Sequence, residues 1–117
     1  MNIRDPSAVE RFRWDWTFLN ESFARGIRVG DADGLVECKG RVLLLEGKHW
    51  RGSYGRGQRL LYEALVAKTV DVVIFWGNPE ARPQTIERIQ VFPQPIRPAT
   101  RDDLAAWVAA WFRAADQ

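Results

Sequence analysis

The chain has 117 residues, 46% of them hydrophobic and 27% charged, which is the length and composition of a single globular domain over residues 1–117. Its one cysteine, Cys38, excludes an internal disulfide and a cysteine-based zinc site, and its one histidine, His49, argues against the usual zinc enzymes, so any metal must be held by oxygen atoms. The net charge of +2 permits a polyanionic partner without requiring one.

The beginning of the chain, MNIRDPSAVERF, has no apolar segment of the kind found in signal peptides. No apolar run approaches the roughly 18 residues of a membrane-spanning helix. We therefore expect a cytoplasmic protein without a membrane partner.

The first predicted element is an amphipathic helix that begins after a capping box of Ser7 and Glu10 and ends at Gly26. Its apolar residues recur at steps of three and four, as a helix with one buried face requires. They are Val9, Phe12, Trp16, Leu19 and Phe23.

A β-hairpin is predicted next, with apolar strands at residues 34–38 and 41–46. Lys39 and Gly40 between them suit a tight turn with positive φ angles. The second strand is apolar without alternation, which is typical of a strand covered on both faces.

The second half of the chain predicts two helices and two strands. A Gly-rich, flexible stretch leads into a helix over residues 58–68, whose expected apolar stripe is Leu60, Leu61, Ala64 and Leu65. Residues 70–77 predict a buried strand, and residues 86–92 predict a strand at the sheet edge, because prolines follow it.

The last helix is capped by Thr100 with Asp103, and its expected stripe is Leu104, Trp107, Val108, Trp111 and Phe112. The order of elements is helix, β-hairpin, helix, strand, strand, helix. We therefore predict an α/β fold in which a mixed sheet is flanked by helices.

Three charged residues lie in the otherwise apolar hairpin. If Cys38 faces Arg41 across the turn, continuing the register outward brings Asp33 opposite Glu46. Lys48 then projects from the same face as Glu46, one pleat further along. Two adjacent carboxylates need a shared proton, a basic partner or a cation. The cluster is therefore either a partly buried Asp–Lys–Glu network or a divalent metal site.

Asp33, the hairpin and Glu46-Gly47-Lys48 together resemble the D…(D/E)xK motif of the PD-(D/E)xK nucleases. The continuation through GRGQRLLYEAL to VDVVIFWG is similar to the VRR-NUC and Holliday-junction-resolvase-like branch, and the resemblance covers about residues 20–77. It implies a restriction-endonuclease-like core.

The resemblance also implies roles for individual residues. Asp33, Glu46 and the backbone carbonyl of Gly47 would hold Mg²⁺ or Mn²⁺, Lys48 would be the catalytic lysine, and Gln58 would support the site. An acid on the first helix often completes such sites. Glu21 is best placed for this, with Glu10 and Asp15 as other candidates.

Two positions depart from the family pattern. Ala32 replaces the proline of the motif, which is a common variation. Gly47 replaces the usual apolar residue, and this is compatible either with a bend that presents its carbonyl or with a degenerate site. Asp31 is either an auxiliary ligand or a turn residue.

The stretch after Lys48 combines basic and aromatic side chains, a combination that suits phosphate contacts and base stacking. A solvated loop is the alternative. The candidate nucleic-acid-binding residues are His49, Arg51, Tyr54, Arg56 and Arg59, and Trp50 lies between the first two.

The sequence thus predicts a Mg²⁺- or Mn²⁺-dependent deoxyribonuclease directed by DNA structure or ends, acting on branched or single-stranded DNA. The alternatives are an inactive nuclease-fold module that binds nucleic acid or protein, as in some small phage or mobile-element proteins, and a nuclease-like inhibitor or assembly protein. A smooth face on the last helix would permit a homodimer, and it is formed by Ala105, Ala106, Ala109 and Ala110.

Overall fold

A computed structural model describes residues 14–117, and the chain divides into two compact units, residues 1–31 and 32–117. Each unit is described by itself. None of the helices among residues 14–117 combines the length and the apolar character needed to cross a membrane.

In the first unit the described residues form one short helix, α2 (Thr17–Asn20). The predicted helix over residues 7–26 is therefore wrong for its described part, while Ser7, Val9, Glu10 and Phe12 lie outside the described residues. Asp15 explains the late start, because its Oδ1 accepts hydrogen bonds from the N–H and the hydroxyl of Thr17. Arg25 and Gly26 have positive φ angles of 60° and 74°, which end any helical path.

The second unit is built on a five-stranded mixed sheet in the order β1-β2-β3-β4-β5. β2 and β3 run parallel, and the other neighbours are antiparallel. The elements in chain order are β1 (Gly34–Cys38), β2 (Arg41–His49), α3 (Arg56–Ala67), β3 (Asp71–Asn78), β4 (Thr85–Val91), β5 (Arg97–Pro98) and α4 (Arg101–Ala115). This confirms the predicted α/β class with a mixed, helix-flanked sheet.

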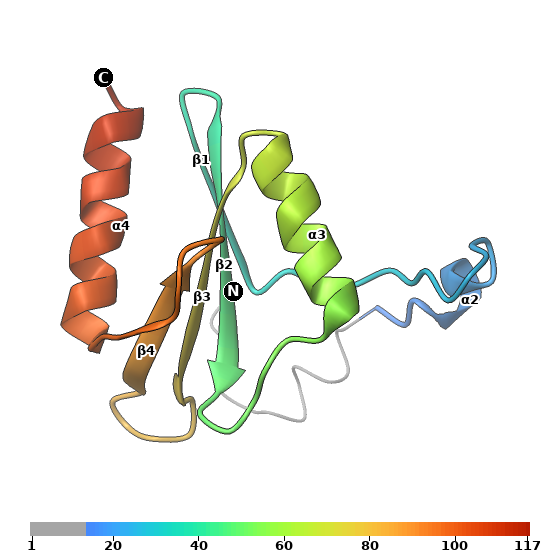
Figure 1. The fold of residues 1–117 in the computed structure, drawn as a ribbon, viewed down its shortest axis with the longest axis horizontal. Helices are drawn as coiled ribbons and strands as arrows, with labels where there is room; N and C mark the ends of the chain where they lie inside the picture. The colour runs from blue at the N-terminus through green and yellow to red at the C-terminus, as the bar shows by residue number, and fades with distance from the viewer. Residues whose placement is uncertain (1–13) are drawn as a thin grey trace. The chain divides into compact units, whose positions relative to one another are not determined.

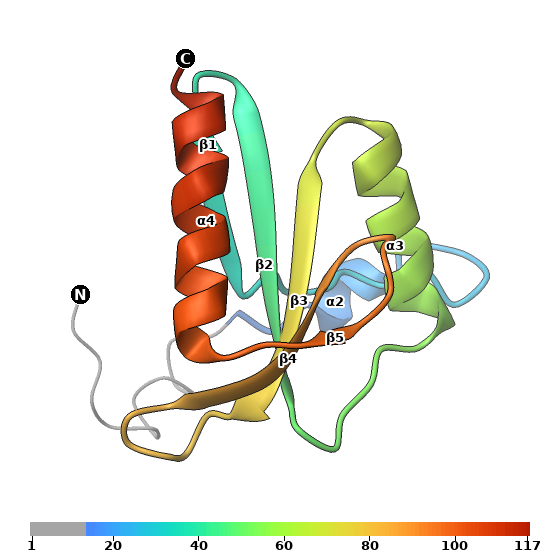
Figure 2. The same cartoon turned by 60° about the vertical axis from the view of Figure 1, so that its left-hand side comes forward.

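The sheet of the second unit separates α3 from α4, as Figures 1 and 2 show from two directions. α3 connects the parallel strands β2 and β3. Adjacent residues of β2 point to opposite faces, so Leu44 packs with Tyr62 of α3 whereas Leu43 packs with Trp111 of α4. The prediction that this strand is covered on both faces is confirmed.

The hairpin has the predicted turn and register. Lys39 and Gly40 adopt positive φ angles of 50° and 87°, and Cys38 pairs with Arg41. The last turn of α4 anchors this end of the hairpin, because Lys39 Nζ donates to the carbonyl of Asp116 at 2.6 Å.

The buried face of α3 differs from the predicted stripe. Leu60 and Leu61 are exposed, and the helix packs on the sheet through Tyr62, Leu65 and Val66. Leu60 and Leu61 precede Tyr62, so the sequence pattern placed the apolar stripe about one residue too early around the helix axis.

α4 begins with the predicted capping box, in which Thr100 and Asp103 exchange side-chain-to-backbone hydrogen bonds. Most of its predicted stripe packs on the sheet, but Phe112 is exposed and Ala115 is buried in its place. Asp71 at the start of β3 binds this helix, since its Oδ2 accepts from Trp111 Nε1 at 2.7 Å and from Arg41 at 2.9 Å.

β4 was expected at the edge of the sheet, and this is wrong. The chain turns back after Phe92, and β5 pairs antiparallel with Arg88 and Ile89 of β4. Pro98 lies in β5 itself, where an edge strand tolerates a residue without an N–H donor.

Candidate metal and nucleic-acid site

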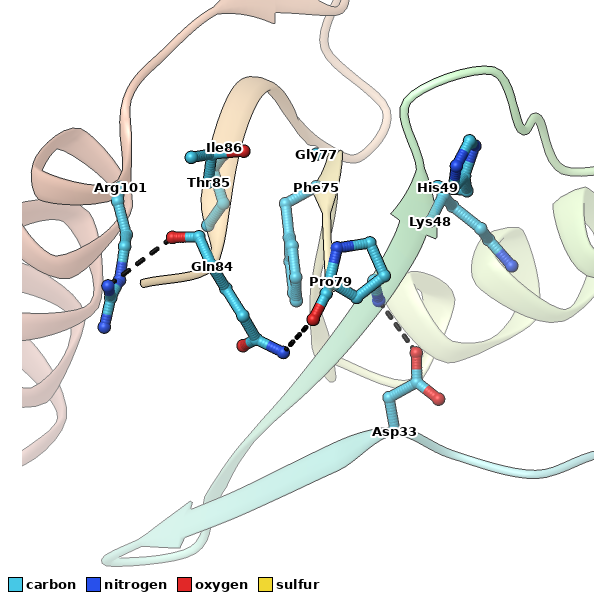
Figure 3. A pocket seen from close by; sticks show the side chains of 11 residues that line it. Asp33, Lys48, His49, Phe75, Gly77, Pro79, Gln84, Thr85, Ile86 and Arg101 are labelled. Carbon is cyan, nitrogen blue, oxygen red and sulfur yellow. Dashed lines mark hydrogen bonds between the residues drawn. The ribbon is translucent and has the colours of Figure 1, made fainter. Parts of the chain in front are cut away.

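Asp33 and Glu46 lie side by side at the open end of the hairpin. The backbone N–H of Asp33 donates to Glu46 Oε2 at 3.3 Å, and the N–H of Gly47 donates to Asp33 Oδ2 at 2.8 Å, the bond drawn in Figure 3. The hairpin register reaches Gly34 opposite Leu45 and so directs Asp33 toward Glu46. The prediction that Asp33 and Glu46 lie next to each other is therefore confirmed.

Glu46 is a buried acid, only 5% exposed, on the face of the sheet that α3 covers. Burial is the main reason that its pKa is raised, and the negative charge of Asp33 acts in the same direction. The N–H of Asp33 and the positive charge of Lys48 partly oppose the rise. A bound cation would favour the ionised form of this carboxyl group.

Lys48 is half-buried on the same strand, two residues after Glu46 and therefore on the same face. Its charge acts on Glu46, yet within residues 14–117 its ammonium group makes no ion pair with either carboxylate shorter than 4.0 Å. The lysine is thus near the acids without being held by them.

Gly47 has a specific packing reason to be glycine. It pairs with Phe75 across the parallel strands, and a Cβ added at Gly47 would lie 2.8 Å from Phe75 Cε2 and 2.9 Å from Cζ. The phenyl ring therefore occupies the space of a side chain at this position. A side chain at position 47 would require this ring to move.

Tyr62 is a candidate site residue that the sequence analysis missed. Its side chain is fully buried, and its hydroxyl has no hydrogen-bond partner among the described residues. The pKa of Tyr62 is raised to about 12, mainly by burial and further by the charges of Glu46, Tyr54 and Asp33. The phenol therefore faces the acidic cluster as a neutral hydroxyl. The available signal was its position one helical turn after Gln58.

The other predicted site residues lie on α3 and in the first unit. Gln58 is half-buried in the first turn of α3, on the same helix face as Tyr62. Glu21 follows α2 and Asp15 precedes it, both in the first unit, and Glu10 lies outside the described residues. Asp31 also belongs to the first unit, where its Oδ1 accepts a hydrogen bond from Trp16 Nε1 at 2.9 Å.

The basic loop between β2 and α3 is tied to the sheet, although its glycines predicted flexibility. Trp76 Nε1 donates to the carbonyl of Gly52 at 2.9 Å, and Arg88 donates to the carbonyl of Trp50 at 3.0 Å. The rings of His49 and Trp50 are in contact, with centroids 3.7 Å apart and planes tilted by 31°. The loop therefore presents a shaped surface.

The predicted nucleic-acid-binding residues have different surroundings. Arg51 is exposed with its guanidinium 5.8 Å from the Trp50 ring, and Arg56 is exposed at the start of α3. Arg59 is exposed and paired with Glu63. Tyr54 is half-buried against Tyr62 and donates to Gln90 at 2.8 Å, so its ring is engaged in the core.

The donor set bears on the predicted metal. Residues 14–117 contain no group of three or more His, Cys, Asp and Glu side chains that could hold a metal ion. Mg²⁺ and Mn²⁺ need only one or two carboxylates when waters, carbonyls or substrate phosphates complete their shell. The two adjacent carboxyl groups fit that requirement. The buried Tyr62 hydroxyl, which has no hydrogen-bond partner within residues 14–117, is close enough to be affected by their charges.

Comparisons of the chain with protein-family models, with curated proteins and with solved structures found no match.

Proposed function

We propose that residues 32–117 form a Mg²⁺- or Mn²⁺-dependent nuclease with a restriction-endonuclease-like core that hydrolyses phosphodiester bonds in DNA. The observation that carries this proposal is the pair of adjacent carboxyl groups, Asp33 and Glu46, with the Lys48 side chain on the same face as Glu46. This combination supplies oxygen ligands for a hard cation and an ammonium group that no acid within residues 14–117 holds in an ion pair.

A divalent cation bound there would lower the pKa of a coordinated water and offset negative charge on the phosphoryl group. Asp33 and Glu46 would hold it together with the carbonyl of Gly47. Lys48 orients the attacking water and donates to the negative charge that develops on the phosphate oxygens. Gln58 supports this arrangement from the first turn of α3, and Arg51, Arg56 and Arg59 contact the DNA backbone.

Tyr62 has a positioning role in this proposal. Its hydroxyl is buried near Glu46, and it remains protonated at any pH at which the enzyme would work, because its pKa is about 12. A neutral phenol can donate a hydrogen bond to the Glu46 carboxylate or to a water beside it.

A second candidate, a nuclease-fold module that binds nucleic acid without cutting it, is supported by a separate observation. Each carboxylate already accepts a backbone N–H, from Gly47 for Asp33 and from Asp33 for Glu46. The cluster can therefore persist as a hydrogen-bonded network without a metal.

A cleavage assay separates the two candidates. Plasmid, linear, single-stranded and four-way-junction DNA are incubated with Mg²⁺, Mn²⁺ or EDTA, for the wild type and for Glu46→Ala and Lys48→Ala. The controls are Glu87→Ala and Lys68→Ala, which remove exposed side chains of the same kinds elsewhere in the unit.

Metal-dependent cutting that both site variants lose and both controls keep is the expected result. Cutting that all variants retain equally would exclude the hairpin as its source. DNA binding in EDTA without cutting under any condition would support the binding module.

A further inference from the structure

A pocket of about 510 Å³ lies on the face of the sheet opposite Tyr62 and Glu46, and Asp33 and Gly47 line one end of it. Figure 3 shows Arg101 and Gln84 on one side of the Phe75 ring and Asp33, Lys48 and His49 on the other. The pocket thus extends from Asp33, one of the two proposed metal ligands, to the start of α4. Its size is within the range of small-ligand pockets.

The wall opposite the hairpin is held by its own hydrogen bonds. Gln84 Nε2 donates to the carbonyl of Pro79 at 2.9 Å, and Arg82 donates to the same carbonyl at 2.7 Å. Arg101 donates to the carbonyl of Gln84 at 3.4 Å. The loop between β3 and β4 is therefore ordered, and the pocket is formed before a ligand enters.

Two glycines allow close packing in the wall of the pocket. Gly47 lies under the Phe75 ring, as described above. At Gly77, where the register between β3 and β4 shifts, an added Cβ would lie against the backbone of Thr85 and Ile86. The phenyl ring, half-buried on β3, therefore lines the pocket beside closely packed backbone.

The lining has the chemistry of a nucleotide site. Phe75 supplies an aromatic surface for a planar base, Gln84 supplies an amide, and Arg101 supplies a guanidinium group for a phosphate. Among the described residues of the lining Asp33 is the one acid, and the proposed cation would offset its charge.

We propose that this pocket binds one unpaired nucleotide of a nucleic-acid strand, next to the phosphodiester that the carboxylate site cuts. The inference rests on the proposed nuclease function and narrows its substrate to single-stranded segments or ends. A base stacked and paired within a duplex cannot enter a pocket of this size without leaving its partner.

The test is binding in EDTA, so that its outcome does not depend on cleavage. A short single strand carrying one fluorescent adenine analogue, its blunt duplex and free deoxyadenosine monophosphate are titrated with the full chain. The variants are Phe75→Leu, which removes the ring, and Arg101→Ala, with Arg113→Ala at the other end of α4 as the matched control.

We expect the single strand to bind about tenfold more tightly than the duplex, with a change in the analogue's fluorescence on stacking. Phe75→Leu and Arg101→Ala should each weaken binding about fivefold or more, and Arg113→Ala should not. Thermal melting checks that each variant is folded, and Arg101→Ala remains informative if Phe75→Leu is not.

Equal affinity for strand and duplex, or an Arg101→Ala variant as tight as Arg113→Ala, would overturn the proposal. Equally tight binding of the free mononucleotide would overturn the assignment to a strand. Normal binding together with failed cleavage would contradict only the nuclease function.

Discussion

Replacing Gly47 by alanine tests whether Phe75 dictates this position of the motif. The added Cβ would lie 2.8 Å from Phe75 Cε2, a distance that requires the ring to move. Overpacking of this kind costs about 1–3 kcal/mol. Alanine in a strand recovers about 0.5–1 kcal/mol relative to glycine. The expected net loss of unfolding free energy is therefore about 0–2.5 kcal/mol.

A double-mutant cycle isolates the contact. In a Phe75→Ala background the space is open, so Gly47→Ala should be neutral or slightly stabilising. The coupling energy should then equal the overpacking cost of about 1–3 kcal/mol, which is within the range for residues in contact. Urea unfolding of the wild type, both single variants and the double variant measures it.

Additive effects of the two substitutions would refute this reasoning, because they would show that the Phe75 ring does not restrict the side chain at position 47.

Three further predictions concern buried polar groups. Tyr62→Phe should raise the unfolding free energy by about 1 kcal/mol, because it removes a buried hydroxyl that has no hydrogen-bond partner within residues 14–117. It should also slow any metal-dependent cleavage, and a loss of stability would show that the hydroxyl is hydrogen-bonded. The folded protein binds the Glu46 proton more tightly than the unfolded chain, so the wild type loses stability as pH rises from 4.5, the ordinary pKa of this acid, to its raised folded-state pKa. Glu46→Gln removes this loss, and its gain in melting temperature over the wild type should therefore grow with pH across that window. A gain that is largest in acid would contradict the raised pKa. Asp71→Ala should cost about 1–3 kcal/mol in chemical unfolding, because it leaves the Trp111 N–H unpaired, and an unchanged midpoint would contradict that role.

The sequence predicted most accurately what local geometry determines. The turn at Lys39 and Gly40 sets the hairpin register by itself, so the meeting of Asp33 and Glu46 followed from counting residues. The capping box of Thr100 was equally local.

Features that depend on residues distant in sequence were not predictable. Whether Leu61 or Tyr62 is buried depends on how α3 lies on the sheet, and apolar pattern alone favoured the leucines. The reason for Gly47 lies in Phe75, across a parallel strand pair that forms only through the α3 crossover. Tyr62 and the pocket wall at Gln84 were missed for the same reason.

The hairpin also bears on the order of folding. Asp33 and Glu46 are 13 residues apart and meet through a tight turn, so they come together with a small loss of loop entropy. The parallel pairing of β2 with β3 has to wait for closure of a longer crossover. We therefore expect the two acids to come together while the sheet is still incomplete and water surrounds them. The energetic cost of burying Glu46 would then arise later, when α3 covers that face.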